Sequence, residues 1–160
     1  MEPTNSLTSY VCGVPVESED LLEVHYPYNG EITGTVTRAT AVHLEEAITR
    51  GSGPQDPLTR YARAEILRKA RALLEDRREE FANLIRAEAG LCQRETFYEV
   101  GRTLDVLEFA AMEALRDDGQ VFSCDLTAQG KARKIFTLRE PVRLVAAITL
   151  ISTLISWSPP

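Results

Sequence analysis

The sequence predicts an α/β fold in which an N-terminal hairpin and long amphipathic helices lead into a strand of a parallel sheet. Three patterns favour this class. Apolar residues alternate with threonines over 32–37, and apolar residues recur about every 3.6 positions over 60–115. An unbroken apolar run over 144–148 is typical of a strand buried on both faces of a parallel sheet. The 160 residues are 44% hydrophobic and 26% charged, which is the composition of a globular domain.

The N-terminal part predicts short strands followed by a short helix. We expect strands over 9–13 and 21–37, the second folded into a hairpin, because Asn29-Gly30 tolerates the positive φ of a tight turn. A helix is expected over 41–50, with Thr40 as its N-cap and Gly51 at its end.

The middle of the chain carries the strongest helical pattern. One apolar stripe runs from residue 60 into a second helix, whose start is predicted by the capping-box spacing of Asp76 and Glu79. Gly90 ends that helix, and a further long helix is expected over 94–115.

The last quarter returns to strand patterns. Apolar and polar residues alternate over 135–140, and Pro141 predicts a bend or a strand boundary because proline has no backbone donor. The run over 144–148 then predicts the buried strand.

Charge and cysteine content exclude several classes of protein. The net charge of −6 argues against a dedicated nucleic-acid binder, which usually has a basic face. Three scattered cysteines form neither a disulfide framework nor a zinc site, so no metal site is expected. The first residues lack the features of a secretory signal, so we expect a cytoplasmic protein. The apolar stretch over 144–160 is too short and too rich in hydroxyl groups for a membrane span.

Few residues suggest catalysis by themselves, and no glycine-rich phosphate loop is present. His25 and His43 are interpreted as ordinary surface or core histidines. The basic cluster at 131–134 could contact phosphate or protect a strand edge from pairing. Cys92 lies just before a predicted helix, where it could be a nucleophile or a packing residue. No catalytic residue is assigned.

The order of several short motifs resembles a known family. They are Pro27–Glu31, Arg63–Ala70, Arg77–Ala82, Glu88–Gly90, Glu95–Val100, Arg139–Val142 and Val145–Thr149. Together they resemble the N-terminal part of the NAD(P)-dependent aldehyde dehydrogenase superfamily, particularly its lactaldehyde and phosphonoacetaldehyde dehydrogenase-like members.

The resemblance carries expectations about fold and site. It implies that 144–148 is the first strand of an incomplete Rossmann-like parallel sheet. It also implies oxidation of a small aldehyde to an acid with NAD or NADP, in a homo-oligomeric enzyme. Ile148 and Thr149 would be the cofactor-binding residues, because the matching backbone in the family lies along the dinucleotide.

The sequence also departs from the family pattern. Leu150, Ile151 and Ser152 stand where the family has a proline, an aromatic residue and the asparagine of the oxyanion hole. Arg143 replaces a family-typical glycine, and no residue matches the catalytic cysteine or the general-base glutamate. We therefore expect residues 1–149 to be an incomplete N-terminal, cofactor-binding-side portion that is inactive alone. Residues 150–160 would be a non-family apolar tail, which a frameshift would explain.

Two other interpretations remain open. The amphipathic helices could form a non-catalytic interaction module whose apolar faces bind a partner. Alternatively, residues 144–157 could act as a weak membrane anchor, although a chain without a membrane partner is the expectation.

Overall fold

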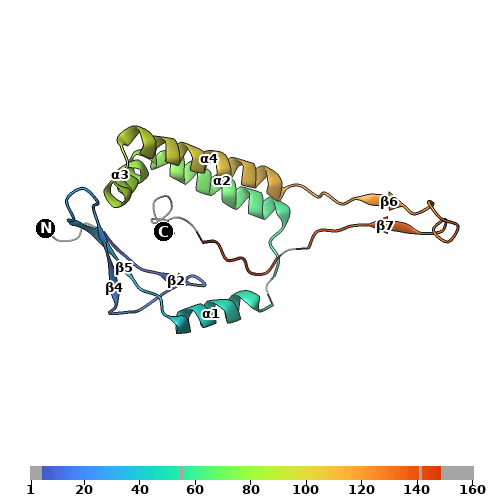
Figure 1. The fold of residues 1–160 in the computed structure, drawn as a ribbon, viewed down its shortest axis with the longest axis horizontal. Coiled ribbons are helices and arrows are strands. Elements are labelled where there is room, and N and C mark those ends of the chain that lie inside the picture. The colour runs from blue at the N-terminus through green and yellow to red at the C-terminus, as the bar shows by residue number, and fades with distance from the viewer. Residues whose placement is uncertain (1–4, 55, 141, 149–160) are drawn as a thin grey trace.

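The computed structural model describes residues 5–54, 56–140 and 142–148. Figure 1 shows a small sheet and helix α1 (Ala41–Ser52) on one side, and a layer of three helices on the other. A hairpin of two strands projects beyond the helical layer. Helices and strands both form, so the predicted α/β class is confirmed.

The predicted N-terminal hairpin is present. Strands β4 (Leu21–His25) and β5 (Ile32–Thr37) pair in antiparallel fashion, with a bulge between Val24 and His25. Gly30 closes the connecting turn with a φ of +72°, where glycine has no Cβ to clash. Strand β1 (Asn5–Leu7), which the sequence did not predict, adds in parallel to the free edge of β5.

The strand predicted over 9–13 forms only at Tyr10 and Val11 and does not extend through Cys12 and Gly13. Strands β2 (Tyr10–Val11) and β3 (Val14–Pro15) instead form a minimal antiparallel hairpin. Cys12 and Gly13 reverse the chain with φ values of +49° and +81°. Two consecutive positive φ values are the conformation of a type I′ turn, whose twist matches that of paired strands.

Helix α1 begins as predicted at its N-cap, Thr40, but it does not end at Gly51. It continues through Ser52, and Gly53 is the C-cap residue, whose backbone N–H donates to the Arg50 carbonyl. Gly51 is thus inside the helix and buried.

The helical layer contains α2 (Arg60–Asp76), α3 (Arg78–Ala89) and α4 (Gln93–Ala114). The predicted capping box at Asp76 is wrong, because Asp76 is the last residue of α2 and Arg77 alone separates the two helices. Gly90 ends α3 in the left-handed conformation, as its position predicted.

The core lies where α4 packs against α2 and α3. Its buried residues come from all three helices, and partly buried apolar side chains surround them. The buried set is Leu74, Ala82, Val100 and Leu104, and the surrounding set is Phe81, Ile85, Phe97 and Leu107. The apolar stripe of the sequence is therefore the core of the helical layer.

The C-terminal third has little buried surface among the described residues. Strands β6 (Val121–Ser123) and β7 (Lys134–Phe136) pair in antiparallel fashion and are exposed, so the strand expected over 135–140 is shorter and begins earlier. The strand expected over 144–148 is wrong for this structure, because these residues have no regular secondary structure and are exposed. No described strand lies beside them to complete a ladder.

Candidate functional site

Only one of the two predicted cofactor-binding residues lies within the described part of the chain. Ile148 is 99% exposed, and Thr149 is outside the described residues. A dinucleotide needs backbone donors at a helix N-terminus and polar side chains that converge on it. Residues 145–148 bring no described helix, strand or buried polar group together, so the described residues do not fit a dinucleotide by themselves.

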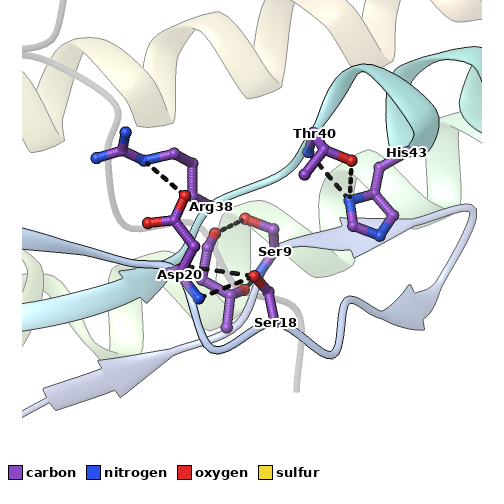
Figure 2. Close-up of polar contacts among 7 residues, drawn as sticks. Ser9, Ser18, Asp20, Arg38, Thr40 and His43 are labelled. Carbon is purple, nitrogen blue, oxygen red and sulfur yellow. Dashed lines mark hydrogen bonds and ion pairs between the residues drawn. The ribbon is translucent and has the colours of Figure 1, made fainter.

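A group of polar side chains joins the small strands to the start of α1 (Figure 2). The Ser9 backbone N–H donates to Thr37 Oγ1 over 2.7 Å, and Ser9 Oγ donates to the Thr37 carbonyl over 2.6 Å. The Asp20 N–H donates to Ser18 Oγ over 3.1 Å, while the Asp20 carboxylate lies 3.7 Å from Arg38 Nε. These polar groups satisfy one another, which indicates a structural junction and not a ligand site.

Both histidines make local contacts. The Thr40 backbone N–H donates to His43 Nδ1 over 3.0 Å, so His43 caps the start of α1 (Figure 2). His25 Nδ1 lies 3.0 Å from the Gly30 carbonyl oxygen and His25 Nε2 lies 3.3 Å from a Glu23 carboxylate oxygen. Each imidazole thus has neighbours from its own helix or hairpin. Across residues 5–54, 56–140 and 142–148, no three histidine, cysteine or acidic side chains are placed to hold a metal ion.

The cysteines are free thiols in separate places. Cys12 lies in the β2–β3 turn and Cys124 follows β6. Cys92 is exposed and occupies the N-cap position of α4, where its carbonyl, not its thiol, accepts the N–H groups of Glu95 and Thr96. The structure gives Cys92 neither a capping thiol contact nor a histidine hydrogen bond among the described residues.

One cleft lies between residues 116–120, which follow α4, and residues 137–139, which follow β7. Asp118 is central to it, 2.7 Å from Arg116 Nη2 and 4.0 Å from Arg139 Nη2. The Arg116 guanidinium also bonds to Glu113, which raises the pKa of Arg116 together with the nearby charge of Asp118. Opposite charges here offset one another, and the lining residues include no nucleophile of the cysteine or lysine type.

The basic cluster at 131–134 belongs to the projecting β6–β7 hairpin. Its lysine and arginine side chains are exposed, and Lys134 pairs in register with Ser123. A charged edge strand and a phosphate contact both remain predictions for this cluster.

A second cleft was not anticipated from the sequence. It lies between the loop that joins α1 to α2 and the residues Glu140, Val142 and Arg143. Arg143 Nη1 donates to the Ser52 carbonyl over 3.2 Å beside it. In the sequence Arg143 stood out only as a departure from a motif, because a contact over 91 positions leaves no local pattern.

No helix within the described part of the chain has the length and apolar character needed to cross a membrane.

Comparison with known proteins identifies the family to which the chain is similar. The aldehyde dehydrogenase family model matches residues 14–150. The chain is 35% identical over 134 residues to aspartate-semialdehyde dehydrogenase 1 of Pseudomonas canavaninivorans, covering 82% of this chain and 28% of that protein. It is 32% identical over 141 residues to 3-sulfolactaldehyde dehydrogenase of Priestia aryabhattai, covering 88% and 30%.

The structure supports the same relationship. It resembles the crystal structure of an NAD-dependent aldehyde dehydrogenase from Sinorhizobium meliloti, with a TM-score of 0.73 and 25% identity over 85% of this chain. That match covers 28% of the other chain, so the present chain spans under a third of the length of these relatives. The family model covers most of the chain, and the chain therefore belongs to the aldehyde dehydrogenase family.

Proposed function

We propose that this chain is the N-terminal portion of an NAD(P)-dependent enzyme that oxidises a small aldehyde to the acid. The observation that carries the proposal is the family match over residues 14–150, which includes both the helical layer and the projecting hairpin. The names of the relatives, a semialdehyde and a sulfolactaldehyde dehydrogenase, support a small aldehyde as the substrate class.

The proposed division of the chain follows the same match. Residues 1–149 form the family portion, and residues 150–160 form an apolar tail outside the family pattern. The family model ends at residue 150, which agrees with this boundary. Sequencing the coding DNA across codon 149 and translating all three frames tests it. A downstream frame with a proline-aromatic-asparagine motif supports an interrupted gene, whereas no continuation in any frame contradicts the frameshift.

The portion of the enzyme in this chain is proposed to be inactive by itself. Aldehyde oxidation through a thiohemiacetal needs a thiolate, donors for the oxyanion, a positioned nicotinamide and a base for water. By the family resemblance, none of these groups has a match here, and Ile148 is 99% exposed. Cytoplasmic location, family-like homo-oligomerisation and the lack of nucleic-acid and membrane partners stay predictions.

A direct assay tests the inactivity. The purified chain is incubated with NAD⁺ or NADP⁺ and a panel of small aldehydes, and absorbance at the wavelength of the reduced nicotinamide is followed. Calorimetric titration with each dinucleotide is done in parallel. We expect neither reduction nor binding, while a full-length relative serves as positive control. Turnover by the isolated chain contradicts inactivity while leaving the family assignment intact.

A non-catalytic interaction module is the second candidate. Large exposed apolar side chains on α2 and α4 favour it, because exposed apolar surface is a feature of interaction sites. These side chains are Tyr61, Ile66, Val106, Phe109 and Met112. Sedimentation of the purified chain discriminates the interaction module from the enzyme portion. A stable, monomeric, cooperatively folding chain favours the module. A chain that aggregates favours an enzyme portion that needs the remainder of its domain.

A further inference from the structure

The residues that follow the projecting hairpin return to helix α1 and contact its last turn. Figure 1 shows the chain after β7 passing the C-terminal end of α1. Arg143 Nη1 donates to the Ser52 carbonyl over 3.2 Å. The last carbonyls of a helix have no intrahelical partner and carry partial negative charge, so a guanidinium is a suitable donor for them.

An apolar contact lies beside this hydrogen bond. Gly51 is buried, and a Cβ placed on it would lie 2.8 Å from Leu144 Cδ1. Leu144 is 47% exposed, so about half of its side chain is covered. Glycine inside a helix is unfavourable relative to alanine. Its presence at position 51 is explained by the close approach of the Leu144 side chain.

The two contacts involve adjacent residues, and one of them, Arg143, also lines a cleft of about 690 Å³. Val142 and Arg143 face the α1–α2 loop across this cleft, and Arg63 of α2 also lines it. The segment is therefore fixed against α1 at Arg143 and Leu144, next to open space and not next to packed core.

Beyond these contacts the chain is exposed. Residues 145–148 are apolar and exposed, and they pair with no described strand. Such a run has the composition of a β-strand, and exposed strands without partners tend to pair with other chains. A contact that limits the motion of this run would therefore oppose its pairing with another chain.

We propose that Arg143 and Leu144 form a latch on the end of α1 that holds the strap, residues 142–148, in place. Arg143 supplies a directed hydrogen bond to the helix terminus, and Leu144 fills the space that Gly51 leaves open. This device is independent of aldehyde oxidation, since it concerns only contacts within this chain.

Native-state proteolysis of the full chain tests the latch. Thermolysin cleaves before large apolar residues, and mass spectrometry separates cleavage at Leu144 and Val145 from cleavage at Leu126. Leu126 is 91% exposed in the β6–β7 hairpin and serves as an internal reference. We expect Arg143→Gln to raise the ratio of strap to reference cleavage about fivefold, the factor that corresponds to the typical net contribution of one hydrogen bond at an exposed site.

Arg139→Gln is the matched control, because Arg139 is an exposed arginine four residues earlier and lies 4.0 Å from the Asp118 carboxylate, a weak ion pair. It should leave the ratio unchanged, and Arg143→Lys should give an intermediate value. A general loosening of the fold raises both cleavages and leaves the ratio unchanged. An unchanged ratio in Arg143→Gln, or an equal rise in Arg139→Gln, overturns the latch.

A double-mutant cycle gives a second measurement. Gly51→Ala should be less stabilising than helix propensity predicts in the native background, because Leu144 occupies the space. In a Leu144→Ala background the same change should be more stabilising, since the space is then free. Additive effects of the two substitutions on the midpoint of urea unfolding overturn the proposed apolar contact.

Discussion

Leu104 is the residue whose truncation should destabilise the chain most clearly. It lies in α4 within the cluster formed with Leu74, Ala82 and Val100, and it is only 4% exposed. Because α4 packs against both α2 and α3, the side chain of Leu104 contributes to the one core that links three helices. Leu104→Ala removes three carbon atoms from this core without adding a polar group.

The expected loss follows from burial. Three buried carbons at about 0.8 kcal/mol each give about 2.4 kcal/mol of lost transfer free energy. A cavity that the helices cannot fully close adds to this, and buried leucine-to-alanine changes cost about 2.7–5.0 kcal/mol in a well-studied series. We therefore expect Leu104→Ala to lower the free energy of unfolding by about 3 kcal/mol, a large part of the stability of a small domain.

Urea unfolding followed by the circular dichroism of the helices measures the loss. At a slope of about 1.5 kcal/mol/M, the midpoint should fall by about 2 M. Val106→Ala is the control, because Val106 lies two residues away on the same helix but is 63% exposed. It should change stability by less than about 0.5 kcal/mol. Equal effects of the two substitutions would refute the three-helix core as the source of stability.

Three further outcomes are expected. Glu88 is half-buried, and burial raises the pKa of its carboxyl, so its charged form weakens the fold and stability is lost as pH rises through the folded-state pKa. Glu88→Gln should therefore raise the melting temperature at neutral pH and leave it unchanged near pH 3. Glu45→Gln is the control at an exposed position and should leave the melting temperature unchanged at both pH values. Equal melting temperatures for Glu88→Gln and the native chain at neutral pH would contradict this. Gly90→Ala should cost about 1–2 kcal/mol, since Gly90 has a φ of +68° and an added Cβ would lie 3.4 Å from Pro27. Gly101→Ala should gain about 1 kcal/mol in the same urea titration, because Gly101 lies inside α4 and an added Cβ would make only an ordinary contact with Arg78 Nη2 at 3.9 Å. A common sign for the two glycine changes would contradict the assigned backbone conformations. Thr59→Ala should lower the free energy of unfolding by about 1 kcal/mol, because Thr59 Oγ1 accepts the Ala62 N–H at the start of α2 over 3.1 Å. Helical content and a urea midpoint that are unchanged by the substitution would exclude this cap.

The helices and the main hairpin could be read from the sequence because their signals are local. The stripe through α2, α3 and α4 repeats within single turns, and Gly90 and Asn29-Gly30 act on the backbone where they occur. The order of short motifs likewise predicted the family, which the match over residues 14–150 confirms.

The predictions from sequence were wrong where one short pattern was compatible with two different structures. Residues 9–13 were expected to be one short strand, but the positive φ values at Cys12 and Gly13 reverse the chain after Val11. Asp76 had capping-box spacing, yet α2 extends through it because the helix gains packing against α4. Gly51 looked like a helix end, although its lack of a side chain is used for the approach of Leu144.

The sequence by itself determined the α/β class, the helical layer and the family, because these depend on periodicity and on the order of residues along the chain. Only the tertiary structure decided that the run over 144–148 is exposed and unpaired, since a strand forms only when neighbouring strands supply its hydrogen bonds. The tertiary structure also decided that Arg143 bonds to the end of α1. Such a contact joins residues 91 positions apart, and its geometry depends on how the whole chain folds back.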